Sequence, residues 1–156
     1  MNENLTNAKT YLNQARLLDQ QINAKLERIV RLRSLAEKIT STISGEAVSH
    51  SPNPTSLQDQ IIRLVEAEDD LNADIDRLVA LKQEIAGVLK LLNDADVQLV
   101  LELRYLCFQP WSGIANTLGY HVRTVQRIHN RALMAVDEIL KSDHYRQIHE
   151  SCRALP

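Results

Sequence analysis

The sequence predicts an all-α protein, built from a long antiparallel helical hairpin and a C-terminal three-helix domain. The first observation is composition, because the 156 residues include only four Gly, four Pro and six aromatic residues and are rich in helix-favouring Leu, Ile, Ala, Glu and Gln. The second is that apolar residues recur at helical spacing over two long stretches. The third is a glycine-centred pattern in the last third of the chain, typical of two short helices joined by a tight turn. Together they exclude an all-β fold.

Composition also limits the class of protein. Apolar residues make up 44% and charged residues 24% of the chain, as in globular rather than disordered proteins. The longest apolar stretches, such as residues 97–101, are far shorter than the ~18 residues of a membrane-spanning helix, and the first residues do not resemble a secretory signal. Cys107 and Cys152 have neither metal-ligand spacing nor the pattern of a disulfide framework. We therefore expect a cytoplasmic protein with reduced thiols, no membrane association, no metal and no cofactor.

Two apolar stripes predict the two long helices. Residues 11–43 are expected to form one amphipathic helix of roughly ten turns, because the spacing of apolar residues averages just under 3.6 and no Gly or Pro interrupts it. Residues 57–92 follow the 4-3 heptad pattern of a coiled-coil seam. The first stripe comprises Tyr11, Ala15, Leu18, Ile22, Leu26, Ile29, Leu32, Ala36, Ile39 and Ile43, and the second comprises Leu57, Ile61, Leu64, Leu71, Ile75, Leu78, Ile85, Leu89 and Leu92.

The segment between the stripes predicts how the two helices pair. Residues 44–56 contain one Gly and two Pro, which stop helices, and Thr55 or Ser56 can cap the next helix. This linker reaches at most roughly 45 Å when stretched, whereas the second helix is about 55 Å long. The linker cannot run back along the second helix, so the helices must pair antiparallel within one chain. Facing residues then have numbers that sum to about 100.

Charge is segregated along the chain and supports this register. Although the net charge is −2, residues 1–43 carry a net charge of +3, residues 57–96 carry −6 and residues 97–156 carry +2. Each exposed ion pair contributes only ~0.2–1 kcal/mol, but several together favour one register. An alternative use of the acidic second helix is the capture of a basic partner. The expected pairs are Lys25 with Asp74 and Asp76, Arg28 and Arg31 with residues 69–72, Arg16 with Glu84, and Glu37 with Arg63.

The last third of the chain predicts a helix-turn-helix motif. Asp94 is expected to cap a third helix that ends near Phe108. If Trp111 is the first motif position, the fifth must be small, the ninth must adopt a positive φ, and the fifteenth and eighteenth should be β-branched and apolar. Those positions hold Ala115, Gly119, Val125 and Ile128, and the apolar fourth and eighth positions hold Ile114 and Leu118.

The second helix of this motif, expected to start near Val122, would enter the major groove of DNA. Arg can bond both O6 and N7 of guanine, and Gln or Asn can bond N6 and N7 of adenine. Other polar side chains nearby would hold phosphates, which position a protein but do not specify a sequence. The expected base-reading residues are Arg123, Gln126, Arg127 and Asn130, and the expected phosphate-positioning residues are His121, Thr124, His129 and Arg131.

Residues 111–133 resemble the promoter-reading fourth region of bacterial sigma factors, and more closely the small phage regulators of late transcription of the ArpU/RinA type. The order of parts over residues 8–140 is similar to a mostly phage-encoded family of Gram-positive bacteria. The similar parts are a long helix, a linker with Ser-Gly and His-Ser-Pro-Asn-Pro, the segments 74–82 and 101–106, and the motif. The resemblance implies DNA binding at phage or prophage promoters, with contact to RNA polymerase.

Three departures from the resemblance concern the helix starts. His121 stands where a capping Ser is usual, Pro110 stands where a Thr cap would open the preceding helix, and Ser112-Gly113 replace an acidic pair. Gly113 costs that helix about 1 kcal/mol. These departures leave the fold in place but leave the DNA sequence that is read open.

We expect three parts: a hairpin at 1–93 with its linker at 44–56, a DNA-binding domain at 94–142 and a tail at 143–156. Two paired helices bury only one stripe each, so the hairpin should pack against the C-terminal domain or against a second chain. We expect a homodimer, which would also let two motifs read two half-sites. No phosphate loop, metalloprotease motif or nucleophile elbow is present, so we expect no enzymatic activity. Two alternatives remain: a DNA-packaging adaptor like a phage terminase small subunit, and a coiled-coil interaction module without DNA binding.

Overall fold

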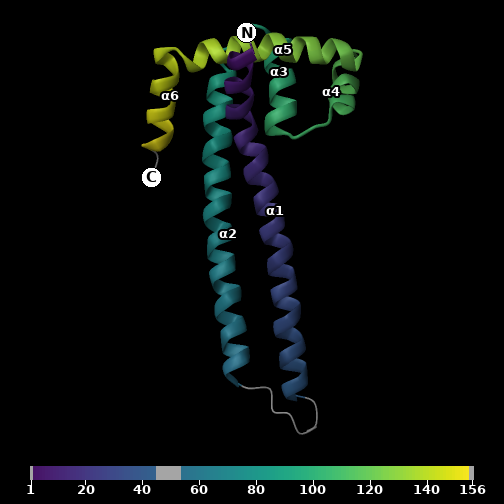
Figure 1. Ribbon diagram of the computed structural model, residues 1–156, viewed down its shortest axis with the longest axis vertical. Helices are drawn as coiled ribbons and strands as arrows, with labels where there is room; N and C mark the ends of the chain where they lie inside the picture. The colour runs from purple at the N-terminus through teal and green to yellow at the C-terminus, as the bar shows by residue number, and fades with distance from the viewer. Residues whose placement is uncertain (1, 45–53, 155–156) are drawn as a thin grey trace. The chain divides into compact units, whose positions relative to one another are not determined.

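The structure is a computed structural model that describes residues 2–44 and 54–154, and the fold over these residues is all-α, as predicted. Residues 45–53 of the predicted linker lie outside the described residues. Within the described ranges, no helix is both long enough and apolar enough to cross a membrane. The helices are α1 (Asn2–Ser44), α2 (Pro54–Leu89), α3 (Ala95–Leu101), a π-helical turn η1 (Glu102–Leu106), α4 (Trp111–Leu118), α5 (Val122–Leu140) and α6 (Asp143–Arg153) (Figure 1).

The chain divides into two compact units. The larger unit comprises residues 1–18 and 78–156, and the smaller unit comprises residues 19–77. Both long helices therefore contribute to both units. The sequence predicted a domain boundary after residue 93, whereas the structure groups the last turns of α2 with the C-terminal helices.

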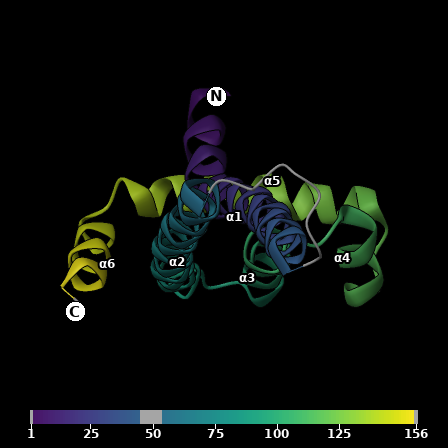
Figure 2. The ribbon, with the colours of Figure 1, turned by 90° about the horizontal axis from the view of Figure 1, so that it is seen from below.

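In the smaller unit, α1 and α2 run side by side in opposite directions (Figures 1 and 2). Ion pairs between the helices set the register, because Nζ of Lys25 lies 2.7 Å from the Asp70 carboxylate and also pairs with Asp74, and Arg33 pairs with Glu68. The numbers of these partners sum to between 95 and 101, close to the predicted value. The Lys25–Asp74 pair was predicted, and the Arg33–Glu68 pair was not.

The seam of the smaller unit differs from the predicted stripes. Ile22, Ile29 and Leu71 are buried, but Leu26, Ile61 and Ile75 are 43%, 48% and 38% exposed. Their assignment to the seam is therefore wrong. On α2 the buried position next to Ile75 is Asp74, whose carboxylate pairs with Lys25 and lies 3.4 Å from Arg77. On α2 the inward positions are 60, 67 and 74, three residues after Leu57, Leu64 and Leu71, so the positions four residues after them, such as Ile61 and Ile75, turn outward. A buried carboxylate is tolerated because it is paired.

The main core lies in the larger unit. It joins the start of α1, the end of α2, the α3–η1 segment and the second half of α5, with α6 packed at its edge. A second, smaller core lies between α3, α4 and the start of α5. The helix α5 contributes to both cores, so its position is set along its whole length. The main core comprises Ala8, Tyr11, Leu12, Ala15, Ile85, Val88, Leu89, Leu92, Val97, Leu101, Tyr105, Ala132, Leu133 and Val136, and the second comprises Val100, Ile114, Ala115 and Val125.

The α3–η1 segment ends where the sequence predicted the third helix to end. Asp94 caps α3, since its side chain accepts hydrogen bonds from the backbone N–H groups of Asp96 and Val97 at 3.0 and 3.3 Å. This cap was predicted. The last turn widens into a π-helix, and Phe108 then adopts a positive φ of 56°. The chain leaves the helix at this residue and reaches α4 through Pro110.

Candidate nucleic-acid interface

The turn between α4 and α5 has the geometry that the sequence predicted. Gly119 adopts a left-handed conformation with φ 69°, and the backbone N–H of Tyr120 donates to the carbonyl of Ala115 at 3.0 Å. The helix α5 begins at Val122, also as predicted. Pro110 and His121 precede α4 and α5 and make no side-chain capping hydrogen bond. The turn therefore depends on its glycine and on the apolar contacts between the two helices.

The two glycines of this region are expected to respond to alanine in opposite directions. A Cβ at Gly113 would lie 3.5 Å from Pro110 Cδ, an ordinary contact inside a helix, so Gly113→Ala is expected to stabilise the protein by about 0.5–1 kcal/mol. A Cβ at Gly119 would meet nothing within 4 Å, but φ there is positive, so Gly119→Ala is expected to destabilise by about 1–2 kcal/mol. Urea unfolding followed by circular dichroism measures both. Shifts of the same sign would contradict this account of the turn.

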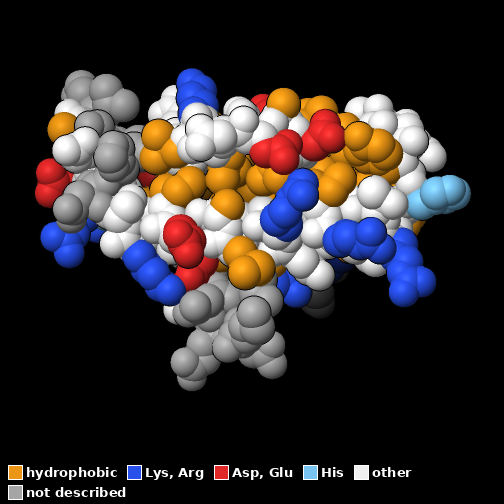
Figure 3. Space-filling model, turned by 90° about the horizontal axis from the view of Figure 1, so that it is seen from above, with side chains coloured by type: hydrophobic (Ala, Val, Ile, Leu, Met, Phe, Trp, Pro, Cys, Tyr) orange, Lys and Arg blue, Asp and Glu red, His pale blue; other side chains and the backbone are white. Residues whose placement is uncertain are grey.

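The first turns of α5 present a polar outer face. Arg123, Gln126 and Arg127 are exposed, whereas Val125 of the same turns is buried in the second core. Among the described residues, no ion pair joins either arginine to an acidic group. Figure 3 shows the molecule from above, with Lys, Arg and His side chains gathered at the end of the surface that is formed by α4 and the start of α5. Asn130 is exposed one turn further along the helix. The structure thus places all four predicted base-reading residues on the surface of a single helix.

Three of the predicted phosphate-positioning residues also reach the surface. His121 is exposed just before α5, and Thr124 is half-buried in its first turn. Arg131 is exposed, but its guanidinium lies 3.3 Å from the carboxylate of Asp94. That carboxylate also caps α3, so Arg131 joins α5 to the start of α3. A phosphate would have to compete with this surface ion pair, which is worth ~0–1 kcal/mol.

His129 does not reach the surface, and its assignment to phosphate positioning is corrected by the structure. Its side chain is only 6% exposed. Nε2 of His129 lies 2.7 Å from the hydroxyl of Tyr105, and the ring of Trp111 packs edge-on against the imidazole at a centroid distance of 4.8 Å. Position 129 is four residues after Val125 and four before Leu133, both buried, so helical spacing already places it on the buried side of α5. The polar type of histidine, and not its position, led to the wrong assignment.

His129, Tyr105 and Trp111 belong to a polar and aromatic cluster that also includes Arg104. The guanidinium of Arg104 lies 4.4 Å from the centre of the Trp111 ring and donates to the carbonyl of Gln109 at 3.0 Å. Burial lowers the pKa of His129 from 6.5 to about 4, and the positive charge of Arg104 acts in the same direction. Burial also raises the pKa of Tyr105 to about 12. At neutral pH the imidazole is uncharged and the phenol is protonated, so the cluster ties η1, α4 and α5 together without a buried net charge on either ring.

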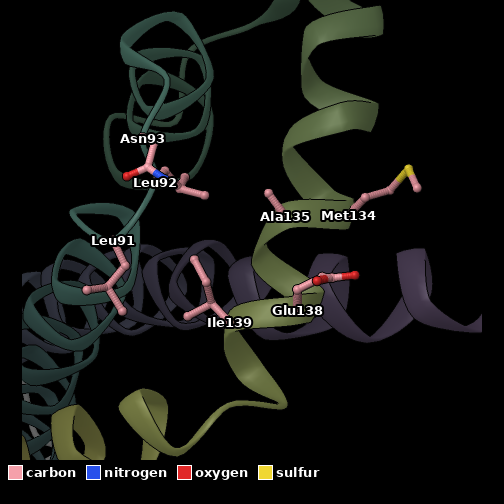
Figure 4. Close-up of a pocket in the computed structure, with 7 residues that line it drawn as sticks. All are labelled: Leu91, Leu92, Asn93, Met134, Ala135, Glu138 and Ile139. Atoms are coloured by element: carbon pink, nitrogen blue, oxygen red, sulfur yellow. The ribbon is translucent and has the colours of Figure 1, made fainter.

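A second surface feature is an open groove beside the second half of α5. It has a volume of about 320 Å³ and lies between α5 and the segment that joins α2 to α3 (Figure 4). Its polar groups are only Asn93 and Glu138, and it holds no set of side chains arranged for general acid–base or nucleophilic chemistry. The lining residues are Leu91, Leu92, Asn93, Met134, Ala135, Glu138 and Ile139.

The described parts of the chain contain no group of three or more His, Cys, Asp or Glu side chains placed to hold a metal ion. Comparison with known proteins adds no relative, because no family model, no curated protein and no solved structure matches the chain.

Proposed function

We propose that this protein is a sequence-specific DNA-binding regulator of transcription, acting in the cytoplasm and of the phage late-gene type that its sequence resembles. In this proposal α4 and α5 form a helix-turn-helix of the sigma-region type, preceded by an antiparallel coiled-coil hairpin. The start of α5 enters the major groove, where Arg123, Gln126, Arg127 and Asn130 read base edges. His121 and Thr124 lie at the same helix end and would hold phosphates.

One observation carries the proposal. Arg123, Gln126 and Arg127 are exposed together on the first turns of a helix that follows a left-handed glycine turn. A helix start offers free backbone N–H groups and a positive dipole end, which favour a phosphate nearby. The opposite side of the same turns is held in a core by Val125. The reading face is therefore presented on a rigid element, as base recognition requires.

The net charge of the protein indicates how much of its affinity for DNA would come from phosphate contacts. A net charge of −2 supports few phosphate contacts and weak binding to arbitrary DNA, because non-specific affinity grows with the number of phosphates neutralised. Specific base contacts, or contact with RNA polymerase at a promoter, would then supply most of the affinity. This fits a regulator that assists polymerase better than a protein that coats DNA.

In vitro selection from random duplex DNA at about 150 mM salt tests the proposal, since non-specific binding is weak under that condition. We expect enrichment of one short motif, and its symmetry would report whether one or two protomers read it. No enrichment for the protein alone, together with no enrichment in the presence of RNA polymerase, would contradict the proposal. A ring of eight or more subunits would instead favour a DNA-packaging adaptor.

A further inference from the structure

The smaller unit exposes a set of large apolar side chains that its own two helices leave uncovered. The set comes from both helices, with Leu26 and Val30 on α1 and Ile61, Val65 and Ile75 on α2. Their exposed fractions run from 38% for Ile75 to 61% for Val30. Scattered exposed apolar residues need no explanation, but a contiguous set is typical of an interaction surface.

Helix geometry places these five side chains on one side of the pair. At about 100° per residue, Leu26 lies about 40–60° and Val30 about 80–100° round α1 from the buried Ile22 and Ile29, in the same rotational sense. The three residues of α2 are displaced in the same rotational sense from the buried side of α2. Because the helices are antiparallel, rotation in the same sense brings both groups to the same side. The ion pair between Arg33 and Glu68 crosses the seam on this side, as the same geometry requires. We call Leu26, Val30, Ile61, Val65 and Ile75 the apolar face.

The opposite side of the pair is mainly polar, with Leu35 as an exposed apolar residue on it. It carries Arg28, Arg63 and Arg77, all exposed, and the ion pair between Lys25 and Asp70. The smaller unit is therefore amphipathic across the pair of helices, and not only along each helix. A two-helix pair buries one stripe per helix, whereas a four-helix bundle buries a second one.

The order of residues along α2 favours a second copy of this chain as the occupant of the apolar face. Val65, Glu68, Asn72 and Ile75 are spaced 3, 4 and 3 residues apart, which is symmetric about position 70. If a second copy of α2 packs antiparallel about that point, residue 65 of one copy faces residue 75 of the other, and residue 68 faces residue 72. Val65 then contacts Ile75 of the second copy, which is also apolar, and the Glu68 carboxylate faces the amide of Asn72, which can donate a hydrogen bond. No like charges meet among these pairs.

The first helix is consistent with the same twofold axis. The ion pairs of the smaller unit place position 70 of α2 beside approximately position 30 of α1. Val30, the most exposed apolar residue of the face, would then meet Val30 of the second copy. In an isologous interface each contact occurs twice, and a residue on the axis contacts its own copy.

We propose that the apolar face is a homodimer interface, in which the α1–α2 pairs of two chains pack antiparallel about a twofold axis near Val30 and position 70 to form a four-helix bundle. The proposal does not depend on DNA binding, because assembly is measured on the protein alone. It predicts a mass of about 35 kDa, twice the 17.7 kDa of one chain.

Charge substitution of the full chain tests both the face and the register. Val65→Glu and Ile75→Lys each place an unpaired charge opposite an apolar residue of the second copy, so each alone is expected to raise the dimer dissociation constant by about 100-fold. The double substitution within one chain places the new carboxylate opposite the new ammonium group in both halves of the interface, so the dimer is expected to return. Light scattering after size exclusion, and sedimentation equilibrium, measure these constants.

Two exposed apolar residues outside the face serve as controls. Leu35 is 43% exposed on the polar side of the pair, and Ile62 is 47% exposed and turned away from α1. Leu35→Lys and Ile62→Lys are expected to leave the dimer intact, and circular dichroism verifies that all variants remain helical. A monomer at about 100 μM would overturn the proposal, as would a dimer unchanged by Val65→Glu. Failure of the double substitution to restore the dimer would overturn the antiparallel register. A monomer that binds a Leu/Lys amphipathic peptide would assign the face to a basic partner instead.

Discussion

Replacing Arg127 or Arg123 with alanine is expected to weaken binding to the selected duplex by roughly 5-fold to 150-fold, equivalent to about 1–3 kcal/mol. Both side chains are exposed at the start of α5, so neither substitution removes buried contacts and the fold should be unchanged. A guanidinium that reads guanine contributes two hydrogen bonds, and alanine removes both. Fluorescence anisotropy titrations with the selected duplex and with single base-pair variants would measure the affinity and show which base pair loses its preference.

Arg63→Ala is the matched control, because Arg63 is exposed on α2 in the smaller unit. It is expected to leave the DNA affinity unchanged. A substitution that weakens binding to all sequences equally and lowers the salt dependence by about one unit would assign that arginine to a phosphate instead. Unchanged affinity in both Arg123→Ala and Arg127→Ala would remove α5 as the reading helix and favour an interaction module without DNA binding.

The buried His129 is expected to make the folded state sensitive to acid. Burial lowers the pKa of His129 to about 4, compared with 6.5 for a free imidazole. Between these values the unfolded chain binds more protons than the folded one, so stability is full above about pH 6.5 and falls as the pH drops towards 4. The full shift corresponds to about 3 kcal/mol, of which about 2 kcal/mol should be lost between about pH 7.5 and pH 5.

His129→Gln isolates this contribution, because an amide can still hydrogen-bond to the hydroxyl of Tyr105 but does not titrate. We expect the variant to be less stable at neutral pH and to lose about 2 kcal/mol less than the natural protein on acidification. Urea unfolding of both proteins at several pH values measures the difference. Carboxylates such as Asp70, whose pKa is lowered by its hydrogen bond to Lys25, titrate in both proteins and cancel. Equal pH dependence in the two proteins would show that His129 is protonated at little cost in the folded state.

Local features of the sequence predicted the elements that local physics controls. The positive φ of Gly119, the start of α5 at Val122 and the cap by Asp94 each depend on a few neighbouring residues. The absence of Gly and Pro over the long apolar stretches predicted the two long helices, whose bounds the structure places at Asn2–Ser44 and Pro54–Leu89. The exposure of Arg123 and Arg127 also followed from helical spacing once Val125 was assigned to the core.

Tertiary packing decided which face of each helix is covered. Position 129 has the spacing of the buried stripe of α5, but only the fold shows that η1 brings Tyr105 to it as the polar partner that a buried imidazole needs. The sequence predicted that Arg131 would contact DNA phosphates, but the start of α3 brings the Asp94 carboxylate to 3.3 Å from its guanidinium. On α2 the side chain of Asp74 is buried at the seam and that of Ile75 is exposed. The buried carboxylate is tolerated because Lys25 of the other helix pairs with it. Helix formation depends on neighbours within about four residues, and the sequence shows those neighbours directly. Burial depends on partners dozens of residues away, and only the fold brings those partners into contact.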